Sequence, residues 1–351
     1  MLYPTPPSKK TIRGVSRDTE VLTPQGFVNV TDVTQDTTLL QYHETGTLSF
    51  TQPCSPIDIF HYNGLAYHFS TRNKKIDQLI TPEQRIPYTH KNTHGESVIK
   101  TTSCLDGLPP HTTNKVSNNY ILGGHINHPD NQTLQPLEKI KLLATQHNIS
   151  FRRSTPNYDL IYIRLHLKPE VDYVTTLLTK AGIPIADQRT TNLTKRLKRE
   201  STLLKVWLPK NIYSKNLEWV NIATVNQQWC QDFIETLITL KPSNNKTYTI
   251  KIKDKKEYTF KKHSHRVACK TTADKLQTIA YMAGYRTRMN LEQHTQDYQS
   301  YGLRFNPESH TVLVRSTVVK PVEYNDLMVR IKVPSGFLAI RRNNVMSITG
   351  G

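Results

Sequence analysis

The period of hydrophobic and polar positions changes along the chain and divides it into three parts. From Val15 to Tyr88, short runs rich in Val, Leu, Thr, Tyr and Phe are separated every ~8–12 residues by turn signals, among them Asn63-Gly64. Apolar and polar residues alternate again from Thr311 to Ile348. Both ends of the chain therefore predict short β-strands joined by tight turns.

The middle of the chain has a helical period instead. Apolar residues recur at helical spacing in three segments, 134–148, 170–181 and 273–283. The last two segments are followed by Gly182 and Gly284, which suit a left-handed helix end. A β-like run precedes each of these two, at 162–167 and at 266–271. A β-helix-β unit is therefore predicted twice, which indicates an internal duplication.

Composition narrows the class of protein. The 351 residues suggest about two domains. The chain has 46 basic and 28 acidic residues, a net charge of +18, and this excess favours a polyanionic partner, most often nucleic acid. No apolar run is long enough to predict a transmembrane span. The 4 cysteines form no CxxC pair, so a zinc ribbon or a disulfide scaffold is not expected, and we predict a reducing, cytoplasmic compartment.

Basic residues gather in two regions that occupy corresponding places in the duplication. A solvated charged surface or a loop would explain one such run, but two corresponding runs favour phosphate binding. The candidate nucleic-acid-binding residues are Arg189, Lys195, Arg196, Lys198, Arg199, Lys251, Lys253, Lys255, Lys256, Lys261, Lys262 and Arg266. Trp207, Trp219 and Trp229 have apolar neighbours and are predicted to be core residues rather than base-stacking platforms.

Both chain ends resemble an intein. Segment 14–33 resembles the first splicing block, and 41–50 and 62–88 resemble the strands that follow it, up to the block that ends in Thr-x-x-His. Segment 329–351 resembles the last blocks of phage-type inteins. The resemblance covers about 125 residues, and it implies a Hint domain, a mostly-β fold built from both ends of the chain.

The middle resembles a two-repeat LAGLIDADG homing endonuclease. Residues 122–130 align with the first motif and 234–242 align more weakly with the second. The family places each motif on a helix, where small residues such as Gly123 and Gly124 allow close packing of the two helices. An acidic residue at each helix foot holds a metal ion at the scissile phosphate, and two β-saddles straddle the duplex.

The predicted fold class is therefore α+β, with a Hint-like domain interrupted by an inserted two-repeat α/β domain. The expected bounds are 1–13 for an N-terminal tail, 14–117 and 301–351 for the Hint-like domain with its linker, and 118–300 for the LAGLIDADG-like domain. The internal repeat implies a monomer with a pseudo-twofold axis. A phage-type origin would place the protein in the host cell cytoplasm.

The chemistry of both families is missing from the matching positions. Gly14 stands where splicing needs a nucleophile, Gln84 where it needs an imidazole, and Gly351 where it needs an asparagine. In the endonuclease motifs, the acidic positions fall on Pro129 and Lys241. Asp130 is the one candidate for a surviving metal ligand, after a shift in register.

Two hypotheses follow from these losses. The first is a non-catalytic nucleic-acid-binding protein without a cofactor or a resident metal. For it we favour structured RNA or a ribonucleoprotein, such as ribosomal RNA, over duplex DNA. The second is an active, Mg²⁺-dependent, site-specific DNA endonuclease that uses Asp130. The vacant catalytic positions favour the first.

Overall fold

The computed structural model describes the following residues: 12–71, 74–91, 97–104, 106, 118–126, 132–144, 149–191, 201–210, 212, 217–240, 246–252, 256–294, 299–306 and 311–350. In 246–252 and 256–264 it describes the backbone. The chain divides into two compact units, one formed by 1–129 with 266–351 and the other by 130–265. The two units are defined by the contacts between their residues. The predicted domain boundaries after 117 and 300 come instead from family resemblance, and they stay a prediction.

The first unit is built mostly from β-strands of the two chain ends. Its strands are β1 (Val15–Ser16), β2 (Glu20–Thr23), β3 (Gly26–Asn29), β4 (Leu39–Tyr42), β5 (Thr47–Thr51), β6 (Asp58–Thr71), β7 (Asp77–Ile80), β8 (Ile86–Lys91), β9 (Ser97–Thr102), β10 (Asn119–Ile121), β11 (His125–Ile126), β18 (Arg286–His294), β19 (Gln299–Asn306), β20 (Thr311–Leu313), β21 (Thr317–Arg330), β22 (Phe337–Arg342) and β23 (Val345–Gly350). This unit also holds α4 (Lys270–Met282) and two short 3₁₀ turns, Val30–Asp32 and Val314–Ser316.

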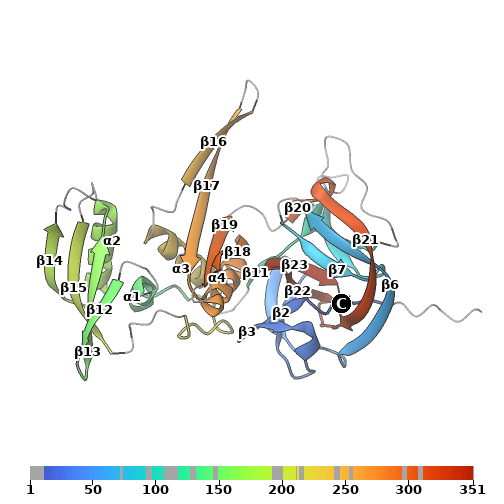
Figure 1. Ribbon diagram of the computed structural model, residues 1–351, viewed down its shortest axis with the longest axis horizontal. Coiled ribbons are helices and arrows are strands. Elements are labelled where there is room, and N and C mark those ends of the chain that lie inside the picture. The colour runs from blue at the N-terminus through green and yellow to red at the C-terminus, as the bar shows by residue number, and fades with distance from the viewer. Residues whose placement is uncertain are drawn as a thin grey trace, which may run out of the picture. The chain divides into compact units, whose positions relative to one another are not determined.

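Strands from opposite ends of the sequence pair throughout this unit. β1, β21, β6 and β7 form a closed barrel in which β6 and β21 pair along their whole 14-residue length and curve around it (Figure 1). A second sheet has the order β11-β5-β4-β22-β2-β3, with β23 paired to β22, and a third has the order β20-β10-β8-β9. The prediction that the two chain ends build one β-rich body agrees with this pairing.

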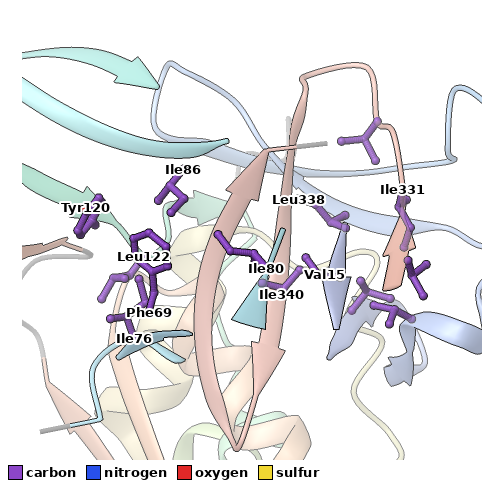
Figure 2. Close-up of a cluster of buried hydrophobic side chains, with 14 of the residues drawn as sticks. Val15, Phe69, Ile76, Ile80, Ile86, Tyr120, Leu122, Ile331, Leu338 and Ile340 are labelled. Atoms are coloured by element: carbon purple, nitrogen blue, oxygen red, sulfur yellow. The ribbon is translucent and has the colours of Figure 1, made fainter. Parts of the chain in front are cut away.

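A large apolar cluster holds these sheets together. Val15 from the first strand, Phe69 and Ile80 from the barrel, and Leu338 and Ile340 from near the end of the chain are all less than 5% exposed and lie in the same core (Figure 2). Burying each such side chain contributes about 1.5–3 kcal/mol. The core therefore ties the first and last segments of the chain together.

A buried arginine joins β22 to α4 within the first unit. The Arg341 guanidinium is fully buried and donates to both carboxylate oxygens of Glu20, at 2.6 and 2.8 Å, and to Asp274 of α4 at 2.6 Å. It also donates to Gln277 at 3.1 Å and lies 3.3 Å from the centroid of the Phe27 ring. A buried charge is tolerated only when it is paired in this way. Arg341 is therefore a structural centre of the unit.

The second unit contains one complete sheet and three helices of the described chain. Its elements are α1 (Pro136–Ala144), β12 (Ile149–Ser154), β13 (Tyr158–Leu165), α2 (Lys168–Lys180), β14 (Ile185–Thr191), β15 (Ser201–Pro209), α3 (Gln227–Thr239), β16 (Lys246–Ile252) and most of β17 (Lys256–Val267). α2 packs against α1 and β13. α3 begins at the Asn226 cap, and the Trp229 and Phe233 rings, 5.2 Å apart, lie in its core with Trp219.

The predicted duplication is confirmed by the order of elements and strands. The series α1-β12-β13-α2-β14-β15 is followed by α3-β16-β17-α4-β18-β19, and the sheet orders β12-β13-β15-β14 and β16-β17-β19-β18 are equivalent. Gly182 and Gly284 end α2 and α4 with φ of +68° and +96°, the left-handed conformation expected there. The run 266–271 was expected to be a strand throughout, but β17 ends at Val267 because α4 begins at Lys270.

Candidate functional site

The two ends of the first unit meet at the turn that follows β7. Thr81 accepts a hydrogen bond from the Gly14 N–H through its side chain, and its own N–H donates to the Gly14 carbonyl, both at 3.0 Å. The Gln84 amide donates to the Thr349 hydroxyl at 3.0 Å and to the Gly350 carbonyl. Two predicted splicing positions, Gly14 and Gln84, are thus brought to the chain end. Gly351 lies outside the described residues.

The side chains that line this junction do not include a group that titrates near neutral pH. A small cleft there is lined by Val15, Gln84, Val329, Arg330, Ile331, Leu338, Thr349 and Gly350. None of these side chains changes its charge between pH 5 and 8. Burial, followed by the like charges of Arg85 and Arg330, lowers the pKa of the neighbouring Arg13, while Asp106 and Glu83 oppose this shift. Position 14 itself therefore has no nucleophilic side chain, and none of the side chains that line the cleft is a neutral-pH base.

The junction is also tightly packed around both glycines. A Cβ atom at Gly14 would lie 3.1 Å from the Phe60 ring and 3.2 Å from Met328. A Cβ atom at Gly350 would lie 2.6 Å from the Cβ of Arg85. Restoring a nucleophile at position 14 would require its neighbours to move. The junction is therefore a packed seam between the first and last segments of the unit.

The described part of the first predicted motif, residues 122–126, does not lie on a helix as predicted. Residues 122–124 are irregular, and His125–Ile126 form β11, which pairs with β5 in parallel. Gly124 faces the turn before β5, where an added Cβ would lie 2.3 Å from the Gly46 carbonyl oxygen. Its lack of a side chain serves this backbone approach rather than helix packing. The expectation for Gly123 and Gly124 is therefore wrong.

The helix that precedes the first sheet is α1, in the place that α3 occupies before the second. The second motif begins on α3, where Ile234 and Leu237 are buried. The predicted acidic positions Pro129, Asp130 and Lys241 lie outside the described residues. Among the described residues, no three His, Cys, Asp or Glu side chains are grouped so that they could hold a metal ion.

One face of the β12-β13-β15-β14 sheet is basic and solvent-accessible. On β13, Ile161, Ile163 and Leu165 are at most 5% exposed, whereas the alternate positions point to the other side. The register places Arg164, Leu203 and Arg189 in one row of that other side, and Tyr162, Lys205 and Asp187 in the next. We call this side the open face. It comprises Ser150, Arg152, Arg153, Tyr158, Leu160, Tyr162, Arg164, Asp187, Arg189, Leu203, Lys205 and Trp207.

Sequence analysis found only part of this surface. Arg189 was predicted, and it lies on the open face, 74% exposed, with Asp187 at 2.8 Å. Arg152, Arg153 and Arg164 were missed because they belong to no dense basic run. The signal that could have found Arg164 is the period-2 alternation of β13, which places it opposite the buried isoleucines.

The predicted environment of the tryptophans holds for two of the three. Trp229 is 3% exposed, and Trp219 packs against it at 6.3 Å between ring centroids. Trp207 instead lies on the open face, half-buried, opposite Leu160. Its apolar sequence neighbours Val206 and Leu208 point to the buried side. Flanking residues in a strand therefore say little about the position between them.

The corresponding sheet of the second repeat also carries arginines on one side. Arg286 and Arg288 of β18 and Arg304 of β19 are partly exposed, and they alternate with the buried Thr287 and Met289. The predicted Arg266 lies beside this group and donates to Glu292 at 2.7 Å. This sheet therefore resembles the first one: one side carries arginines, and the other side is buried.

For the remaining predicted basic residues, the structure describes at most the position of the backbone. Lys251, Lys256, Lys261 and Lys262 lie on the paired strands β16 and β17, where the backbone register is Lys251 opposite Glu257 and Thr247 opposite Lys261. The others lie outside the described residues: Lys195, Lys198, Lys253, Lys255, Arg196 and Arg199. Their contact with phosphate stays a prediction.

Comparison with known proteins gives neighbours in structure alone. No family model matches the chain, and no curated protein matches it. The chain is similar to a splice-inactive variant of the AceL NrdHF class 3 split intein, with 9% identity, 96% of this chain and 97% of that chain covered, and a TM-score of 0.35. It is also similar to I-DmoI in complex with DNA and Mn, with 12% identity, 49% and 88% coverage and a TM-score of 0.31.

A second I-DmoI structure, of mesophilic variants of this homing endonuclease, covers 49% of this chain and 90% of that one, with 12% identity and a TM-score of 0.29. These structures are an intein and a homing endonuclease, the two classes of protein that the sequence motifs resemble. No helix among the described residues is long and apolar enough to cross a membrane.

Proposed function

We propose that this protein binds nucleic acid through the basic sides of its two repeated sheets and performs neither splicing nor strand cleavage. It would derive from an intein-encoded homing endonuclease. The proposal needs no metal and no organic cofactor. It assigns the Hint-like part a structural role and the repeated part the binding role.

The open face is the observation that carries the proposal. Arg153, Arg164 and Lys205 lie on neighbouring strands of one sheet, and their side chains share one side. Asp187, the acid of this face, is paired with Arg189. A sheet that presents several cations in register to solvent suits a regularly spaced polyanion, because each phosphate contact releases counterions.

The packed junction supports the non-catalytic part of the proposal. Splicing would need a thiol or hydroxyl at position 14, where the neighbours leave little room for a Cβ atom. Mass spectrometry of freshly expressed protein, with and without thiol, tests this part. We expect the intact chain alone, and a fragment that begins at residue 14 or 15 would refute it.

Nucleic-acid binding is tested by fluorescence anisotropy with a labelled RNA hairpin and a labelled DNA duplex between 50 and 200 mM salt. The triple variant Arg153→Ala, Arg164→Ala, Lys205→Ala should flatten the plot of log K against log[salt] by about 2–3 units. The matched control removes the same charge from α1 and α2 by Lys139→Ala, Lys168→Ala and Lys180→Ala. Equal losses in the two variants, or no binding by the wild type, would contradict the proposal.

A further inference from the structure

The open face carries aromatic rings at its centre as well as cations around it. Tyr162 of β13 and Trp207 of β15 lie on the two central strands of the sheet. Tyr162 is opposite Lys205, and Trp207 is opposite Leu160, so the two rings are diagonal neighbours. Such neighbours are about 7–8 Å apart at Cα. Tyr158, 48% exposed, continues the aromatic row along β13.

A bulge in β12 brings a guanidinium over the Tyr162 ring. The pairing of β12 with β13 shifts register between Phe151 and Arg153, so Arg152 lies at the bulge. Its guanidinium carbon lies 5.3 Å from the centroid of the Tyr162 ring. Arg152 and Arg153 are both exposed. The bulge thus places two consecutive cations at the edge of the aromatic row.

The arrangement fits nucleotides whose bases are not paired. In duplex nucleic acid the flat faces of the bases are stacked on one another, and proteins reach only base edges, sugars and phosphates. The partly exposed Trp207 ring offers a flat face for an unpaired base, and the Arg152 guanidinium over the Tyr162 ring offers a second stacking plane. The surrounding cations, Arg153, Arg164 and Lys205, suit the phosphates that connect such bases.

We propose that the open face binds the unpaired nucleotides of an RNA loop, with bases stacked on Trp207 and on the Arg152 guanidinium that covers Tyr162, and phosphates on the flanking Arg153, Arg164 and Lys205. Structured RNA presents such loops beside its helices, and sequence-specific RNA recognition targets them. Ser150, in the same row as Tyr162, adds a hydroxyl that can hydrogen-bond a ribose 2′-OH. This inference rests on the proposed function and names the substrate class.

Four probes test the inference by fluorescence anisotropy: an RNA hairpin with a ten-nucleotide loop, the blunt RNA duplex of its stem, single-stranded DNA of the loop sequence, and a DNA duplex. We expect the hairpin to bind more tightly than each of the others. Trp207→Ala should weaken hairpin binding by about 5- to 150-fold, the range for loss of one base–aromatic stack, and leave duplex binding unchanged. Trp207→Phe should retain most of the affinity, because the smaller ring still stacks.

Tryptophan fluorescence gives an independent readout. The hairpin should quench the emission of the wild type and not that of Trp207→Phe, whose remaining Trp219 and Trp229 pack together in the other part of the unit. Tyr162→Ala is a second variant, and circular dichroism of both alanine variants confirms folding. If Trp207→Ala does not fold, the quenching of wild-type fluorescence and the affinity of Tyr162→Ala test the inference in its place.

The outcomes separate this inference from the proposed function. Equal affinity for hairpin and duplexes, with no effect of Trp207→Ala or Tyr162→Ala, overturns the inference and leaves nucleic-acid binding intact. Single-stranded DNA that binds as tightly as the hairpin overturns the assignment to RNA. Failure of all four probes to bind overturns the proposed function as well.

Discussion

The junction of the chain ends and the open face of the first repeat use the same residue classes in opposite ways. At the junction, the polar groups of Thr81 and Gln84 are buried and bonded to the backbone of Gly14 and Gly350. On the open face, polar and aromatic side chains point to solvent. A packed polar cluster stabilises the fold, whereas an exposed one is available to a ligand. Changes at the junction should therefore alter stability, and changes on the open face should alter binding.

The largest expected effect is on binding. Lys195→Ala, Arg196→Ala, Lys198→Ala and Arg199→Ala together should flatten the salt dependence of the affinity by about 3–4 units. If about six phosphates are contacted, the wild-type slope is near −5, and affinity falls about a thousandfold between 50 and 200 mM salt. Salt titration by anisotropy checks both values.

The control for this quadruple variant is Lys139→Ala, Lys168→Ala and Lys180→Ala, which removes charge from α1 and α2, outside the basic run. If neither set alters the slope, the basic run is only a solvated surface. Arg341 and Arg342 are unsuited as a surface control. Their side chains are 0% and 12% exposed and are ion-paired.

The next effect is on stability and concerns Arg341. Replacement by Met keeps the apolar stem and removes the charge, which leaves Glu20, Asp274 and Gln277 without their common donor. We expect a loss of about 3 kcal/mol in the free energy of unfolding, at the low end for a broken buried pair because both carboxylates reach solvent. Urea denaturation measures the loss. Arg17→Ala, which breaks the exposed pair with Asp326, should cost less than about 1 kcal/mol.

A loss with Arg341→Met no larger than with Arg17→Ala would show that the buried network adds little. A fall in the affinity of the folded protein would show that the two regions are coupled. Either result would weaken the distinction between a region that stabilises the fold and a region that binds nucleic acid.

Sequence reasoning succeeded where a local pattern has one physical cause. The helical periods before Gly182 and Gly284, and the alternating strands at both chain ends, gave the right elements because burial of one face dictates them. It failed at 122–126 because glycines that suit helix packing equally suit a close backbone approach. It missed Arg164 and misplaced Trp207 because the alternation of sides along β13 and β15 decides which side a residue faces, and neither the density of charge nor the character of the flanking residues does.

A smaller effect is expected from Gln84. Its amide is 3% exposed and donates to the Thr349 hydroxyl and the Gly350 carbonyl, so Gln84→Ala leaves two buried acceptors without this donor. The cost should be about 1–3 kcal/mol. Thermal unfolding measures it, with Gln52→Ala, at an exposed position, as the control. Nucleic-acid affinity should be unchanged, and a variant as stable as wild type would show that the seam is not held by this side chain.

The smallest expected effect is that of Asp130→Asn, which decides between the two functions. An active endonuclease would need carboxylates to hold Mg²⁺ at the scissile phosphate, and this residue is the candidate that the first motif leaves. Under the binding function, the change removes one acid from a basic protein and leaves affinity within about twofold, with a slight gain from reduced repulsion. Incubation of wild type and variant with a library of duplex DNA sites and Mg²⁺ or Mn²⁺ is the measurement. We expect no site-specific cuts from either protein. Double-strand cuts by the wild type that disappear in Asp130→Asn would establish an enzyme, and the open face would then serve to position its substrate.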